Sequence, residues 1–222
     1  MNDRGPFQGR FISFEGGEGV GKSTQSQLLS QRLECCGFQV VQTREPGGCL
    51  FSEQLRHLLV SGSPETMDAK TELLLMTAAR IEHVRQLIQP ALRQGKWVIC
   101  DRFFDSTLAY QGFGRGMDRS FIEMLHGWAI GEWVPDLTIL LTMDPQDGIK
   151  RSREKWGLLN DHGAEVRFEM EEAAFHQRVN EGFITLARSD PRRFRVIDAM
   201  GSKETIVEAV WGAVKGVFPE VA

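Results

Sequence analysis

The sequence predicts an α/β protein, in which a parallel sheet of about five strands carries helices on both faces to form a three-layer sandwich. Short apolar segments bounded by turn residues alternate with longer segments of helical periodicity. Such alternation is typical of parallel strands joined by crossover helices. Polar residues that could carry chemistry stand where the predicted strands end, and parallel sheets bind ligands at that edge. The length of 222 residues suits a single domain, residues 1–222.

Composition and charge exclude several kinds of protein. Hydrophobic residues make up 41% of the chain and charged residues 25%, as in ordinary soluble globular domains. The net charge of −4 gives no reason to expect nucleic acid or an anionic membrane as a partner, so any basic site has to be local. No apolar segment reaches transmembrane length, and the first residues lack an apolar signal core. The four cysteines lack the spacing of a zinc site or a disulfide framework, so we expect reduced thiols in a cytoplasm.

The first predicted strand, residues 11–14, leads into the glycine-rich loop G-G-E-G-V-G-K-S at 16–23. The spacing G-x-x-x-x-G-K-[ST] between a strand and a helix is typical of a phosphate-binding loop, and this order disfavours a simple surface turn. Glycines let backbone N–H groups approach phosphate oxygens, and the following helix adds the positive end of its dipole. We expect Lys22 to reach the outer phosphates of a bound nucleotide and Ser23 to offer its hydroxyl to Mg²⁺. The predicted nucleotide-binding residues of this loop are Gly16, Gly17, Glu18, Gly19, Val20, Gly21, Lys22, Ser23 and Thr24.

The remaining elements follow this first unit in regular order. Gly37 is a suitable C-cap for the first helix, and the turn residues 43–48 end the second strand with Arg44 at its exit. The glycine-rich residues 112–116 are expected to break the helix before them, and residues 156–164 are expected to be another loop. The other expected strands are 38–42, 97–101, 136–143 and 194–197; the expected helices are 25–36, 52–59, 68–88 with a last turn near 90–95, one from about 106, 119–130, 146–155, 165–188 and 203–218.

Asp101 ends the third predicted strand, and Arg102 follows it directly. An acid at the end of a buried strand beside a phosphate loop is the usual place for a partner of Mg²⁺, often through water. Arg102 would then face whatever binds there. A helix-capping acid with a surface arginine is the alternative, which the need of the phosphate loop for a metal partner disfavours.

A basic segment follows the fourth predicted strand and contains Lys150, Arg151, Arg153 and Lys155. Arg151 and Lys155 are four residues apart and share a helix face. Arginines that close on transferring phosphates stabilise the charge of the transition state, so we predict a lid at about 146–170. Taken alone, such a charge run is more typical of a solvated helix face, and only the phosphate loop favours the lid.

Three arginines from separate segments could hold a phosphorylated acceptor: Arg44, Arg80 and Arg102. A phosphomonoester is already mostly dianionic at pH 7, so it needs positive charge and positioning more than a base. A lone helical arginine such as Arg80 is usually at the surface, although with Met76 four residues earlier it could form a pocket wall for a flat ring. The five histidines show no partner spacing, so a Ser/His/Asp hydrolase is not supported. The pattern predicts a small-molecule kinase.

Six motifs appear in one order: the phosphate loop within 14–24, T-R-E-P-G-G at 43–48, A-A-R at 78–80, D-R at 101–102, A-Y-Q-G at 109–112 and P-D-L-T at 135–138. In their order and approximate spacing the chain resembles the thymidylate kinase family over nearly its whole length. The R-E-P-G-G turn and the Y-Q-G run are specific to that family, whereas the phosphate loop alone is not. The resemblance implies transfer of the γ-phosphate of ATP to dTMP, giving dTDP, with Mg²⁺.

The resemblance also implies roles for individual residues. Glu18 would contact the sugar 3′-hydroxyl, Arg44 and Arg102 would hold the acceptor phosphate, and Arg80 would bond the thymine edge. Tyr110 would pack near the sugar and disfavour a ribose 2′-hydroxyl. The substrate-binding set implied in this way is Glu18, Arg44, Met76, Arg80, Arg102, Ser106, Tyr110 and Gln111.

No arginine lies between Glu18 and Lys22, so the phosphate loop resembles the bacterial form of the family. That form takes its catalytic basic residues from the lid, here Arg151 and Arg153, with Lys155 as a further candidate. The implied catalytic residues are therefore Lys22, Arg102, Arg151 and Arg153, and the implied metal ligands are Ser23 and Asp101. The family also implies a homodimer formed through helices beside the long pocket helix.

Several positions depart from the family pattern. Met76 stands where the family stacks thymine on an aromatic ring, and methionine covers a ring face less selectively. Val166 stands where an aspartate is usual, and residues 157–164 lengthen the lid. Two alternatives therefore remain beside a dTMP kinase: a related kinase for dUMP or another deoxynucleotide, and a phosphate-loop protein that binds nucleotide as a regulator without catalysis.

Overall fold

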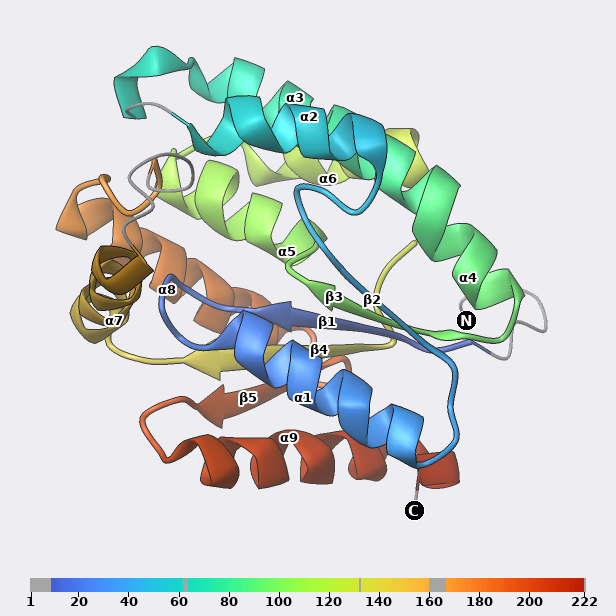
Figure 1. Ribbon diagram of the computed structural model, residues 1–222. Helices are drawn as coiled ribbons and strands as arrows, with labels where there is room; N and C mark the ends of the chain where they lie inside the picture. Colours follow the sequence, from blue (N-terminus) through green and yellow to red (C-terminus); the bar gives the residue numbers. More distant parts are fainter. Residues whose placement is uncertain (1–8, 62–63, 132, 160–166, 222) are drawn as a thin grey trace.

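The computed structural model describes residues 9–61, 64–131, 133–159 and 167–221, with the side chains of residue 64 and of 155–159 left out (Figure 1). Five parallel strands form one sheet: β1 (Phe11–Glu15), β2 (Val40–Arg44), β3 (Trp97–Asp101), β4 (Leu137–Thr142) and β5 (Phe194–Asp198). Their order in the sheet is β2-β3-β1-β4-β5, so the strand that precedes the phosphate loop is central. The predicted parallel sheet is confirmed.

The helices alternate with the strands, as a parallel sheet requires. They are α1 (Lys22–Cys35), α2 (Leu50–Val60), α3 (Ala69–His83), α4 (Gln89–Arg93), α5 (Phe104–Thr107), α6 (Arg119–Ile130), α7 (Pro145–Leu159), α8 (Ala173–Ser189) and α9 (Lys203–Val217). Two π-helical turns, Val84–Ile88 and Leu108–Gly114, and two 3₁₀ turns, Pro64–Thr66 and Pro219–Val221, complete them. Within the part of the chain described here, none of the helices has the length and apolar character needed to span a bilayer.

The two faces of the sheet are covered by different helices, because strand side chains alternate between them. On one face Phe14 and Ile99 pack against α1 and α9, which lie together in Figure 1. On the other face Phe11 and Val98 pack against α3, α4 and α6, and α8 covers the part near Leu140. The three central strands, β1, β3 and β4, are therefore buried along almost their whole length, whereas the edge strands β2 and β5 also carry exposed polar residues. The strands end at one edge, where the site described below lies.

The second strand and the long central helix differ slightly from prediction. β2 starts two residues later than expected, and its register with β3 runs from Val40 opposite Trp97 to Arg44 opposite Asp101. The long helix continues from α3 through the π turn into α4, and Pro90 lies in the first turn of α4. A first turn tolerates proline, because its N–H groups lack helical partners.

The predicted loop at 112–116 is wrong for its first half, since the π-helical segment Leu108–Gly114 continues through it. The glycines serve close packing here. An added Cβ at Gly114 would lie 2.6 Å from the ring of Phe175 on α8, and one at Gly112 would lie 3.0 Å from Arg119 Cγ. The backbone turns away only at Gly116, where φ is +73°.

The segment around the predicted lid also differs. α7 extends to Leu159, beyond the expected start of a loop at residue 156, whereas residues 160–166, including Val166, lie outside the described residues. The next helix was expected from about residue 165, but α8 begins at Ala173. Arg167 gives the reason, because its side chain is fully buried and donates to Glu72 of α3 at 2.6 Å, which ties the segment before α8 to another element.

Candidate active site

The phosphate loop lies between β1 and α1, at the carboxyl end of the sheet. Gly16, Gly19 and Gly21 have φ of +136°, +67° and +97°, conformations that side chains rarely adopt. An added Cβ at Gly16 would overlap the carbonyl oxygen of Leu141, and one at Gly19 would overlap that of Gly148 on α7. The glycines therefore let the loop pass directly over β4 and the start of α7.

Lys22 opens α1 and is nearly buried, with a relative exposure of 7%. Its Nζ donates to the carbonyl oxygens of Gly16 at 3.1 Å and Gly17 at 2.5 Å. Burial and the neighbouring Arg102 lower the pKa of Lys22 to about 8, although Glu18 acts against both. The negative charge of an incoming phosphate would stabilise the protonated, positively charged form of Lys22.

Ser23 and Asp101 meet beside the loop, as predicted for a magnesium site. Ser23 Oγ donates to Asp101 Oδ2 at 2.5 Å. A hydroxyl and a carboxylate are oxygen ligands that Mg²⁺ prefers, and this ion commonly completes its shell with water and substrate phosphates. Among the described residues no group of three or more His, Cys, Asp or Glu side chains could hold a metal by itself. The donor set therefore fits an ion that arrives with a nucleotide.

Arg102 lies between the phosphate loop and the opposite wall of the pocket. Its backbone has a φ of +68°, unusual for a residue with a side chain. Its guanidinium donates to Gly16 O at 2.9 Å, to Ser106 Oγ at 3.1 Å and to Glu18 Oε1 at 2.8 Å. The guanidinium carbon also stands 5.0 Å from the ring centroid of Tyr110. Arg102 thus connects the loop to the helix that follows β3.

Glu18 is the centre of a charged cluster in the pocket. Tyr110 donates its hydroxyl to Glu18 Oε1 at 2.6 Å, and Arg102 binds the same oxygen. Although burial opposes it, the positive charges of Arg102 and Lys22 hold the pKa of Glu18 at about 2. Glu18 is therefore ionised throughout the physiological range, and it orients two predicted acceptor-binding residues.

Arg80 of α3 is held on several sides. Its Nε donates to Glu45 Oε2 at 2.7 Å, and its Nη2 donates to Thr107 Oγ1 at 3.0 Å and to Phe103 O at 3.4 Å. The side chain is 5% exposed, and His83 lies 3.0 Å from the second oxygen of Glu45. This buried guanidinium forms part of the pocket wall together with Met76, whereas a lone helical arginine is usually at the surface.

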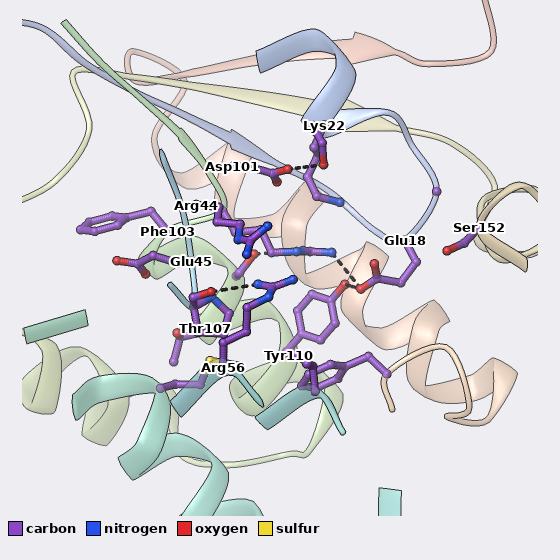
Figure 2. Close-up of a pocket in the computed structure, with 18 of the residues that line it drawn as sticks. Glu18, Lys22, Arg44, Glu45, Arg56, Asp101, Phe103, Thr107, Tyr110 and Ser152 are labelled. Carbon is purple, nitrogen blue, oxygen red and sulfur yellow. Dashed lines mark hydrogen bonds and ion pairs between the residues drawn. The ribbon is translucent and has the colours of Figure 1, made fainter. Parts of the chain in front are cut away.

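These groups line one pocket of about 610 Å³ (Figure 2). Figure 2 shows Lys22 and Asp101 at one end of the pocket, with Arg56, Thr107 and Tyr110 at the other. The predicted residues that line it are Glu18, Gly19, Gly21, Lys22, Ser23, Thr24, Arg44, Met76, Arg80, Asp101, Arg102, Ser106, Tyr110, Gln111 and Arg151. Gly16, Gly17, Val20 and Arg153 do not line it.

The basic residues of α7 are not gathered at the pocket. Arg151 lines it, and its Nη1 donates to Ala199 O at 3.2 Å. Arg153 instead donates to the backbone carbonyl of Glu169 at 3.3 Å. The side chain of Lys155 lies outside the described residues. Of the two lid arginines predicted to be catalytic, Arg151 lines the pocket and Arg153 does not.

Two other predicted residues are held by acids. Arg44, with a side chain 52% exposed, pairs with Glu53 at 3.0 Å. Gln111 is 1% exposed and donates to the fully buried Glu72 at 2.7 Å. Glu72 therefore fixes the orientation of the Gln111 side-chain amide.

Sequence reasoning missed several residues that line the pocket: Glu45, Pro46, Arg56, Val60, Phe103, Thr107, Ser152, Phe168 and Glu169. Glu45 and Pro46 belong to a recognised motif, and Phe103 and Thr107 adjoin predicted residues, so the motifs could have found them. Arg56 gave no signal beyond that of a helical arginine.

Comparisons with known proteins agree with this geometry. The family model described as "Thymidylate kinase" matches residues 14–210. The chain is 49% identical to a thymidylate kinase of Magnetococcus marinus over 95% of this chain and 98% of that protein, and 47% identical to one of Solidesulfovibrio magneticus over 92% and 98%.

A solved structure is similar as well. The crystal structure of thymidylate kinase from Ehrlichia chaffeensis has a TM-score of 0.74 and 36% identity, covering 93% of this chain and 98% of that one. Sequence and fold thus agree along almost the entire length, and the chain belongs to the thymidylate kinase family.

Proposed function

We propose that the protein transfers the γ-phosphate of ATP to dTMP, forming dTDP for the synthesis of dTTP. The observation that carries this proposal is a single pocket in which a phosphate loop faces a separate set of arginines. A kinase for a monophosphate needs two anion sites within reach of each other, one for the donor and one for the acceptor. Family membership favours dTMP as the acceptor.

The donor end of the pocket would bind ATP through backbone N–H groups of residues 16–23 and the ammonium of Lys22. Ser23 and Asp101 would hold Mg²⁺ together with phosphate oxygens. When bound, this ion would neutralise charge on the outer phosphates of the nucleotide. Lys22 would exchange the carbonyl oxygens that it now binds for phosphate oxygens.

The acceptor end would bind dTMP through its phosphate and its base. Arg44 and Arg102 would neutralise the acceptor phosphate, and the fixed guanidinium of Arg80 would donate to a thymine carbonyl. Met76 would cover a face of the base, and Tyr110 would lie beside the sugar. Because the acceptor phosphate is already ionised, these residues position and neutralise, and the reaction needs no general base.

We propose that residues 146–170 act as a lid that supplies Arg151 and Arg153 to the transferring phosphate. Arg151 already lines the pocket. Arg153 would have to exchange the carbonyl of Glu169 for the phosphate. Closure would add positive charge and exclude water at the moment of transfer.

We also propose a homodimer, in the cytoplasm where reduced thiols persist. α2, α3 and α6 lie on the same side of the molecule in Figure 1 and expose a row of apolar side chains. The row comprises Leu50, Phe51, Leu58, Leu74, Phe121, Met124 and Trp128, of which Leu50 is 81% and Trp128 is 78% exposed. Exposed apolar side chains on neighbouring helices are typical of an interface, and a second copy of the chain fits the family expectation.

The test is an ADP-release assay with ATP and Mg²⁺, run with dTMP, dUMP, dGMP, dCMP and no acceptor. Strong preference for dTMP would support the proposal and show that Met76 serves in place of an aromatic ring. Equal turnover of dUMP would still support a kinase, but one with another or a broader deoxynucleotide acceptor. Nucleotide binding without acceptor-dependent turnover would favour the regulator.

A further inference from the structure

Glu15 ends β1 directly before the phosphate loop, and its side chain has no exposed surface. It does not line the pocket. Its two carboxyl oxygens instead bind the segment that follows β3. Oε1 accepts from the backbone N–H of Phe103 at 2.7 Å, and Oε2 lies 2.5 Å from Ser106 Oγ. One buried acid thus joins the end of the central strand to the turn that contains Arg102.

That turn has an unusual backbone conformation. Arg102 has a φ of +68°, and its N–H donates to Phe14 O at 2.9 Å. The next N–H, that of Phe103, points to Glu15. A left-handed non-glycine residue persists only where its surroundings hold it. The bond from Phe103 to Glu15 is therefore part of what holds Arg102 in this conformation.

The second contact of Glu15 leads to the Arg102 side chain. Ser106 Oγ binds Glu15 and also accepts from the Arg102 guanidinium at 3.1 Å. A hydroxyl has two lone pairs and one proton, so it can serve both neighbours at once. Backbone and side chain of Arg102 are thus both fixed through one carboxyl group.

We propose that Glu15 is a positioning residue for Arg102, which it holds through Phe103 N–H and Ser106 Oγ at the acceptor end of the pocket. This inference rests on the proposed function, in which Arg102 binds the acceptor phosphate. Displacement of a positioned charge by about 1 Å can cost up to about a hundredfold in rate, so a buried residue of this kind affects catalysis without touching substrate.

Glu15 acts mainly as a hydrogen-bonding group at neutral pH. Burial and the negative charge of Asp105 raise its pKa to about 8, although Ser106 and Arg102 oppose this shift. A glutamine has the same shape, with an oxygen for Phe103 N–H and an NH₂ group for Ser106 Oγ. Glu15→Gln therefore keeps both hydrogen bonds without a carboxyl group, and Glu15→Ala removes both hydrogen bonds.

The experiment is a double-mutant cycle of Glu15→Ala and Arg102→Ala, read as KM and kcat for dTMP and ATP and as equilibrium binding of dTMP and of thymidine. We expect Glu15→Ala to raise KM for dTMP at least about tenfold, with KM for ATP and binding of thymidine changed less than about twofold. Glu15→Gln should restore KM for dTMP to within about threefold of the wild type. In the Arg102→Ala background, Glu15→Ala should have no further effect on KM for dTMP.

Asp105→Asn is the matched control, because Asp105 is equally buried on α5 but binds Arg193 instead of Arg102. It should lower stability and leave the ratio of the two KM values unchanged. An equal rise of both KM values in Glu15→Ala, or an undiminished effect in the Arg102→Ala background, would overturn the inference. If Glu15→Ala does not fold, Glu15→Asp replaces it, since a side chain shorter by one methylene cannot reach both donors. Absence of dTMP binding by the wild-type protein would instead overturn the proposed function.

Discussion

Lys22 would exchange its present hydrogen-bond partners for phosphate oxygens when a nucleotide binds. Its ammonium is nearly buried and bound to two carbonyl oxygens of its own loop. Lys22→Ala should lower kcat by at least about 10³, because the variant lacks the point charge on the transferring phosphate. The fold should be retained, since the amine makes only loop contacts. Steady-state kinetics with a far-ultraviolet circular dichroism control checks this, and near wild-type turnover would contradict the phosphate-loop assignment.

Glu15 also makes the stability of the protein depend on pH. Between an unfolded pKa near 4.5 and a folded pKa of about 8, the folded protein keeps a proton that the unfolded chain releases. The free energy of unfolding should therefore fall as pH rises from 5 to 8, by up to about 1.4 kcal/mol per unit from this group. Below pH 4.5 both states are protonated and the contribution is constant.

Urea unfolding of the wild type and Glu15→Gln at pH 5, 6, 7 and 8 measures this dependence. Groups common to both proteins cancel in the difference, so the wild type should lose stability relative to the variant as pH rises. Parallel curves would show that Glu15 titrates at its ordinary pKa.

Residues that make contacts inside the protein were the hardest to predict. The motifs placed Lys22, Arg80 and Arg102 at one pocket. The sequence marks Glu15 only by its place directly after the first predicted strand, and Glu72 gave no signal at all. The sequence does not distinguish a carboxylate that pairs with buried donors from one that is exposed to solvent. Burial depends on contacts between residues that are far apart along the chain.

At the scale of elements, the proposed lid depends on α7, the helix that carries Arg153. Arg153→Ala should lower kcat by about 10³ with KM for dTMP little changed, because this arginine acts on the transferring phosphate and not on acceptor binding. Its present partner is a backbone carbonyl, so little stability should be lost with it. Steady-state kinetics at saturating ATP checks the split. A large rise in KM with unchanged kcat would assign Arg153 to the acceptor site.

The alternation of short apolar segments with segments of helical periodicity predicted every strand and nearly every helix. This pattern follows directly from burial of the sheet on both faces. It failed where side-chain size decided the packing. The glycines of residues 112–116 indicate a break, yet Gly112 and Gly114 allow neighbouring helices to approach closely. Likewise, the periodicity of residues 165–188 did not reveal the buried ion pair of Arg167 with Glu72, which precedes α8.

At the scale of the whole molecule, the exposed apolar face of α2, α3 and α6 predicts the quaternary state. Trp128→Glu places a charge at a side chain that is 78% exposed in the single chain. We expect this variant to shift from dimer to monomer with its fold retained, because burial of an unpaired charge in an interface is unfavourable. Light scattering after size exclusion measures the mass, and Glu181→Lys on α8, outside this face, is the charge-change control. A wild-type monomer would contradict the proposed dimer.

The close approach of Gly19 to Gly148 brings the backbone of the phosphate loop into contact with the backbone of α7. Gly19 belongs to the loop that would hold ATP, and Gly148 lies in the first turn of the helix that carries the lid arginines. Only hydrogen atoms separate the two backbones, so neither can move toward the other without displacing it. A nucleotide that shifted the loop would therefore also displace the first turn of α7, the helix that carries Arg151 and Arg153, through this main-chain contact.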